Sequence, residues 1–116
     1  MTWNNMPPTD RDRLIATTVM GLSADDTSLF TRDMGEAWRV VDHVRSSLAT
    51  DHLIGRILSF DLCYDAQCTR RPWLATFVIG DTLSGVTTRL GMADDPAAAI
   101  CLAAIRLFSP GIAPEG

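Results

Sequence analysis

Apolar and polar residues recur along this chain with two different periods. Residues 31–49 form the clearest amphipathic helix, because apolar side chains recur there in steps of three and four while most charged ones fall on the opposite side. Its apolar positions are Met34, Ala37, Trp38, Val41, Val44 and Leu48. This stripe predicts that the helix lies across a small sheet and that Trp38 packs in the core rather than binding a ligand. Thr31 is expected to cap the helix.

A period of two follows in the next part of the chain. It predicts β-strands at residues 55–64, 73–80 and 86–92. The second of these segments is apolar on both faces, which favours a central position in the sheet. Because the connections between the segments are short, we expect an antiparallel meander.

One helix is predicted on each side of this central part. The first begins at Thr9 and is stopped by Gly21, and the last begins at Asp94 or Asp95 and ends at Pro110. The last helix carries small residues that would let it approach the sheet closely, namely Ala97, Ala98, Ala99, Ala103 and Ala104. The expected order is α-α-β-β-β-α, an α+β fold with a three-stranded antiparallel meander.

Length and composition narrow the classes of protein. The 116 residues suit a single domain over 1–116, with loose termini at 1–8 and 110–116. The alternative for the N-terminal arm is that Trp3 and Met6 pack onto the domain. All ten residues counted as Lys or Arg are arginine. The net charge of -4 argues against direct nucleic-acid binding, which needs clustered positive charge. No signal peptide and no apolar run of about 20 residues is present, so we expect a cytoplasmic protein with no membrane partner.

Three segments together resemble the phage ABA-sandwich family of small bacteriophage proteins. They are DRLIATTVMG at 12–21, the capped stretch with Ala-Trp and Val-Val at 31–41, and the segment with AICLAA at 94–107. The resemblance implies an α-β-α layered fold and a phage or prophage gene, and it implies no activity. Residues 22–30 depart from the family pattern, since this loop is shorter and lacks the family's aromatic residues, so no shared ligand is inferred.

The residues that could carry chemistry are few and scattered. Cys63 and Cys68 have a Cys-x4-Cys spacing, which is not typical of a zinc site, and His43 and His52 lie elsewhere. We therefore expect no metal, no cofactor and no enzymatic activity. A small hydrolase that uses a Cys or an Asp is the enzyme alternative. We expect free thiols in a reducing compartment, with Cys101 as a small core residue.

The order of elements is also similar to that of double-stranded RNA-binding domains. Those domains present basic residues at the start of the closing helix. Here that position holds Asp94, Asp95 and Pro96, so the charge has the wrong sign and duplex binding is excluded.

Two groups of charged residues are candidates for partner binding. They are Asp25, Asp26, Asp61 and Asp65, as an acidic patch, and Arg70 and Arg71, in a predicted hairpin loop. The alternative for both groups is a solvated surface. We expect a non-enzymatic, phage-encoded binding protein that inhibits a host defence complex, such as a CRISPR effector, by protein–protein contact.

A second function stays open from the sequence. The chain could instead sequester a small molecule such as a nucleotide signal, which needs a pocket with converging arginines. The available donors are Arg56, Arg70, Arg71 and Arg89. A sheet of three strands also leaves an edge or a face for a homodimer.

Overall fold

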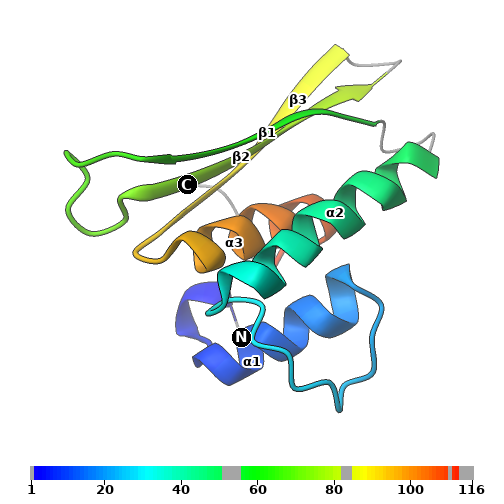
Figure 1. Cartoon of the computed structure of the whole chain (residues 1–116), viewed down its shortest axis with the longest axis vertical. Coiled ribbons are helices and arrows are strands. Elements are labelled where there is room, and N and C mark those ends of the chain that lie inside the picture. The colour runs from blue at the N-terminus through cyan, green and yellow to red at the C-terminus, as the bar shows by residue number, and fades with distance from the viewer. Residues whose placement is uncertain (1, 51–55, 82–84, 110, 113–116) are drawn as a thin grey trace.

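The computed structural model describes residues 2–50, 56–81, 85–109 and 111–112, with the backbone alone at 48–50, 56–58 and 81 (Figure 1). In chain order its elements are η1 (Trp3–Asn5), α1 (Pro8–Leu14), η2 (Ile15–Val19), α2 (Met34–Thr50), β1 (Arg56–Tyr64), β2 (Trp73–Asp81), β3 (Gly85–Ala93) and α3 (Pro96–Phe108). η1 is a 3-10 turn and η2 a single π-helical turn. The order of helices and strands confirms the predicted α-α-β-β-β-α arrangement and the α+β class.

The three strands form one antiparallel sheet in the order β1-β2-β3, which confirms the meander and the central second strand. Phe77 of β2 lies opposite Phe60 of β1 and Arg89 of β3, so these three side chains share one face of the sheet. Phe77 and its neighbour on that face, Ala75, are fully buried. This is therefore the face on which the helices pack.

α3 packs closely against this face. Nine consecutive residues of the helix, 97–105, are buried, as expected for a helix that is apolar on all sides. The close approach depends on Gly91 of β3, where an added Cβ would lie 2.3 Å from the carbonyl oxygen of Ala99 and 2.5 Å from the backbone nitrogen of Ala103. The predicted close packing of the small-residue helix is therefore present, and the strand contributes the smallest residue to it.

The layers differ from the expected α-β-α sandwich. Figure 1 shows α1, α2 and α3 on the same side of the sheet, with α2 and α3 next to it and α1 below them. The π turn η2 joins this arrangement from α1, since Ile15, Ala16 and Val19 are all buried in the core. The apolar side of the first helical stretch therefore packs against the other helices. The opposite face of the sheet keeps exposed apolar side chains, with Val86 63% exposed.

The N-terminal arm is anchored, contrary to the expectation of a loose segment at 1–8. Trp3 is 4% exposed and belongs to the hydrophobic core. Its backbone N–H donates to the Ile112 carbonyl at 3.2 Å, and its carbonyl accepts from Arg11 Nε at 2.9 Å. Burial of the large indole ring supplies the free energy that orders this arm.

The first helical stretch starts earlier than predicted and ends where predicted. α1 begins at Pro8, so Thr9 lies inside the helix and does not cap it. Gly21 has a φ of 68°, the left-handed conformation that glycine adopts at helix ends. The N–H of Met20 donates to the Ile15 carbonyl at 3.0 Å and closes the π turn, and the N–H of Leu22 donates to the Ala16 carbonyl at 2.7 Å beyond it.

Of the two other predicted helix caps, the structure corrects the one of α2 and confirms the one of α3. Asp33 caps α2, because its Oδ1 accepts the Glu36 N–H at 3.0 Å, whereas Thr31 turns its side chain to a different partner. Asp95 caps α3 as predicted, accepting from the N–H groups of Ala97 and Ala98. Among the described residues, no helix is long and apolar enough to cross a membrane.

Replacement of Gly91 by alanine tests the contact between α3 and the sheet. Because the new methyl group would overlap backbone atoms of α3, which cannot rotate away, we expect G91A to lower the free energy of unfolding by about 3 kcal/mol. Gly111, which has nothing within 4 Å of its added Cβ, provides the matched control G111A. Urea denaturation measures both. Equal stability of the two variants would contradict the close packing.

Candidate functional site

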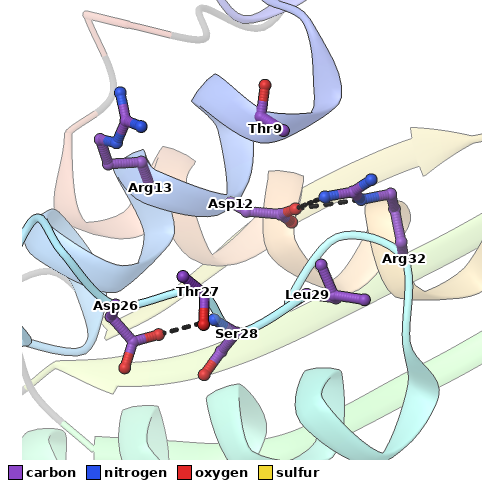
Figure 2. Close-up of a pocket in the computed structure, with 8 residues that line it drawn as sticks. All are labelled: Thr9, Asp12, Arg13, Asp26, Thr27, Ser28, Leu29 and Arg32. Atoms are coloured by element: carbon purple, nitrogen blue, oxygen red, sulfur yellow. Dashed lines mark hydrogen bonds and ion pairs between the residues drawn. The ribbon is translucent and has the colours of Figure 1, made fainter.

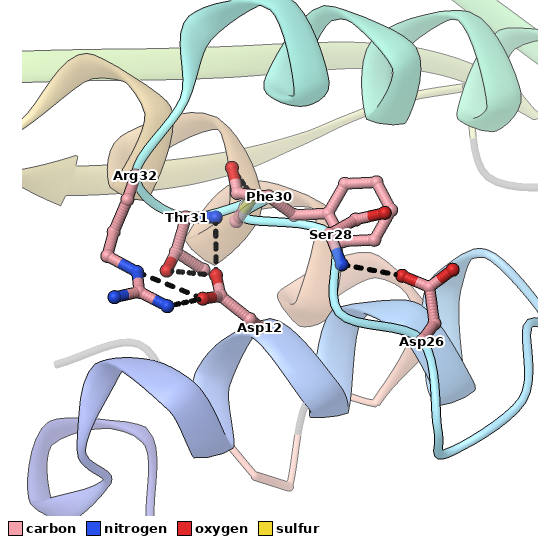
Figure 3. A network of polar contacts seen from close by, with 7 residues as sticks. Asp12, Asp26, Ser28, Phe30, Thr31 and Arg32 are labelled. Atoms are coloured by element: carbon pink, nitrogen blue, oxygen red, sulfur yellow. Dashed lines mark hydrogen bonds and ion pairs between the residues drawn. The ribbon is translucent and has the colours of Figure 1, made fainter.

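A buried carboxylate joins α1 to the segment before α2 (Figure 3). Asp12, which is 5% exposed, accepts at Oδ1 from the Thr31 N–H at 2.8 Å and from the Thr31 hydroxyl at 2.5 Å. Its Oδ2 accepts from Arg32 Nε at 3.0 Å and from Arg32 Nη2 at 2.6 Å. Four donors therefore use the acceptor capacity of both oxygens. This pattern is that of a structural ion pair, and it leaves Asp12 without room for a metal or a substrate proton.

A cleft of about 240 Å³ lies beside this network. Figure 2 shows Thr9, Asp12 and Arg13 on one wall and residues 26–29 on the other, with Arg32 at one end. The wall at 26–29 is held by Asp26, whose Oδ1 accepts the Ser28 N–H at 2.9 Å. Hydrogen bonds from the Ser28 side chain and backbone lower the pKa of Asp26, so this carboxyl is ionised at neutral pH.

The four predicted acidic residues do not form a single patch. Asp25 and Asp26 lie in the loop after η2, whereas Asp61 lies on the exposed face of β1 and Asp65 in the hairpin loop after it. In Figure 1 these two loops lie at opposite ends of the molecule. One acidic patch built from all four carboxylates is therefore not supported by their geometry.

The cysteines differ in their accessibility. Cys63 is exposed, and Cys68 is half-buried with its thiol donating to Asp65 Oδ2 at 3.5 Å. The hydrogen bond to Asp65, together with its negative charge, raises the pKa of Cys68 and makes the thiol a weaker nucleophile. Cys101 is buried as predicted, its thiol donates to the Phe30 carbonyl at 3.2 Å, and burial raises its pKa well above the ordinary value.

In the described part of the chain, no histidine joins the cysteines to form a metal or catalytic site. His43 lies on α2, where its Nε2 is 3.3 Å from the Ser47 hydroxyl, and His52 lies outside the described residues. Within the described residues, no three His, Cys, Asp or Glu side chains are grouped as a metal site would require.

The predicted arginines are brought together only in part. Arg70 and Arg71 line one cleft of about 320 Å³, and Arg11 of α1 joins them there. Arg89 lies elsewhere on the helix-covered face of β3, with its Nη1 donating to the Thr88 carbonyl at 3.1 Å. The side chain of Arg56 lies outside the described residues.

Trp38 is the clearest error of the sequence interpretation. Its side chain is 46% exposed, although it follows the apolar stripe of α2. The ring contacts Phe60 of β1 edge-on, with 5.6 Å between ring centroids. β1 is the edge strand of the sheet, so nothing in the described structure pairs with it on the side away from β2. The core simply ends at this strand, and Trp38 covers its rim.

Further apolar side chains continue along β1 from this contact. Phe60, Leu62 and Tyr64 lie on the same face of the strand, and Tyr64 is 59% exposed. Tyr64 contacts Trp73 of β2 edge-on, with 5.0 Å between centroids. We call the four aromatic side chains and the leucine between them the aromatic row, namely Trp38, Phe60, Leu62, Tyr64 and Trp73. The alternation of β1 was visible in the sequence, but its exposure was not.

Comparisons with models of protein families, with curated protein sequences and with solved structures give no significant match. The resemblance to the phage ABA-sandwich family therefore stays a prediction that rests on three sequence segments.

The Asp12 network predicts a specific loss of stability. In D12N one carboxylate oxygen becomes an NH2 group, which faces the donors of either Thr31 or Arg32, and the negative charge that pairs with Arg32 is lost. We therefore expect the free energy of unfolding to fall by about 2 kcal/mol. The exposed pair of Asp10 and Arg13, 4.0 Å apart, gives the control D10N, which should change it by less than about 0.5 kcal/mol. Thermal denaturation of both variants measures the difference. Equal melting temperatures of D12N and D10N would refute the structural role of Asp12.

The cysteines predict an order of chemical modification. With iodoacetamide at pH 8 we expect Cys63 to react first, Cys68 more slowly and Cys101 only after unfolding. D65N removes the negative charge but keeps an oxygen for the Gln67 N–H, so it should accelerate the reaction at Cys68. Mass spectrometry of peptides follows each site. An unchanged rate at Cys68 in D65N would show that Asp65 does not control this thiol.

Proposed function

We propose that this protein is a non-enzymatic binding protein that acts by protein–protein contact through the aromatic row. The observation that carries the proposal is the exposure of Trp38 and Tyr64, at 46% and 59%, beside the edge of β1 that no described strand pairs with. Tryptophan and tyrosine are enriched among the residues that dominate protein interfaces, because each covers a large area at a small entropic cost.

Two carboxylates of β1 and its loop offer contacts to basic groups of a partner, next to Arg70 and Arg71 of the same loop. Asp61 lies on the opposite face of β1, and Asp65 follows Tyr64 directly. A partner strand added to the edge of β1 would use the backbone groups of the edge for hydrogen bonds and place its own side chains against the row. Lysine or arginine at its flanks would meet these two carboxylates.

The partner that we propose is a host defence complex, of which a CRISPR effector is one example. The support is the resemblance to small bacteriophage proteins, which would place this chain in the cytoplasm of an infected bacterium. The inhibitor would occupy a protein surface of the complex. The homodimer is a separate prediction, and light scattering would distinguish a mass of 12.7 kDa from twice that value.

A capture experiment with matched variants tests the proposal. Tagged wild-type protein is incubated with purified CRISPR effector complexes and with bacterial lysate, and the retained proteins are quantified. We expect Y64A, and more strongly W38A, to weaken retention of a stoichiometric partner by about 30-fold, which corresponds to about 2 kcal/mol. Because Tyr64 is mostly exposed and loses only its edge-on contact with Trp73, Y64A should lower the melting temperature by no more than a few degrees.

The control is V86A, which removes an exposed apolar side chain from the other face of the sheet and should retain the partner. Failure to recover any stoichiometric partner would refute the proposal. Equal retention by wild type, Y64A and W38A would show that the contact lies elsewhere than the aromatic row.

A further inference from the structure

A second surface of the molecule gathers positive charge. The cleft of about 320 Å³ lies where α1 and η1, the loop after β1, the end of β3 and α3 meet. Six of the residues that line it are Asn4, Arg11, Arg70, Arg71, Asp94 and Leu102. Three guanidinium groups against one carboxylate leave an excess of two positive charges, in a chain whose net charge is -4.

Arg11 is held in position before any ligand arrives. Its Nε donates to the Trp3 carbonyl at 2.9 Å, and its guanidinium carbon lies 5.2 Å from the centroid of the Trp3 ring. Trp3 is itself buried and tied to Ile112. The described hydrogen bonds use only Nε, so the two terminal nitrogens of Arg11 stay available to an anion.

Arg70 and Arg71 face the same cleft from a braced loop. The Asp65 N–H donates to the Pro72 carbonyl at 2.7 Å, and its side chain accepts the Gln67 N–H at 2.9 Å. Neither arginine has a carboxylate within ion-pair distance in the described structure. By contrast, Arg13, Arg32, Arg39 and Arg45 each pair with one.

We propose that this cleft binds a small phosphate monoester with a polar organic group, the chemical class to which nucleoside monophosphates belong. The planar donor fork of arginine matches phosphate oxygens, and the excess of two positive charges matches a phosphate dianion. Asp94 and Asn4 offer an acceptor and an amide for hydroxyl or amino groups, and Leu102 offers an apolar wall. The volume suits a ligand of that size rather than a polymer.

Calorimetric titration with the full chain tests this site. The probes are AMP, GMP, CMP, UMP and ribose 5-phosphate, with adenosine and inorganic phosphate for comparison. We expect at least one phosphate monoester to bind at least tenfold more tightly than either comparison compound. The double variant R70A/R71A should weaken that binding at least tenfold.

The control is R45A, which removes an exposed arginine of α2 that does not line the cleft, and it should bind as wild type does. Arg11 is left intact because it also holds the N-terminal arm. No binding by any of the five monoesters overturns the inference, as does equal binding by wild type and R70A/R71A. Inorganic phosphate that binds as tightly as the best monoester overturns the assignment of an organic ligand. These variants leave the aromatic row unchanged, so the outcome is independent of the partner protein.

Discussion

The structure depends on the contact of α3 with the sheet at Gly91. A helix can lie this close to a strand only where the strand presents no side chain, and here glycine faces the backbone of Ala99 and Ala103 and the Cβ of Leu102. The result is a helix with nine consecutive buried residues, enclosed by the sheet, α2 and η2. The other helices therefore pack on α3 as much as on the sheet. This explains why the molecule is layered as sheet, helix pair and first helix.

A second constraint fixes the first helix to this core. The carboxylate of Asp12 gathers Thr31 and Arg32 from a segment about twenty positions later in the chain. A buried carboxylate is costly unless its lone pairs are satisfied, and here four donors satisfy them. The network also decides where α2 begins. Because Thr31 is used by Asp12, the capping role passes to Asp33, two residues further on.

The elements could be predicted from the sequence because their signals are local. The period-two segments, the stop at Gly21 and the cap at Asp95 each depend on a few neighbouring residues. Trp38 could not be placed in this way. Its position on the apolar stripe indicates the direction in which it points, but not that β1, an edge strand, leaves it half-covered. Packing of Trp3 onto the domain was possible from the sequence but not preferred, since no periodic pattern indicates a single anchoring side chain.

The candidate sites were harder to predict because they join distant parts of the chain. Arg11 and Arg71 are sixty positions apart, and nothing near either residue indicates the other. The same limit applies to the four aspartates that were predicted to form one patch, because the fold places them on two distant parts of the surface. Only Arg70 and Arg71, which are adjacent in the chain, were expected together and are found in one cleft.

A mismatch of length connects the two surfaces proposed to bind. Each strand has nine residues and spans about 30 Å, whereas the thirteen residues of α3 span about 20 Å. The sheet therefore extends beyond α3, as Figure 1 shows at the end that carries the hairpin between β1 and β2. Tyr64 and Trp73 stand on this overhang, and Arg70 and Arg71 follow in its loop. A core that needs only the central part of the strands thus leaves their ends free for recognition.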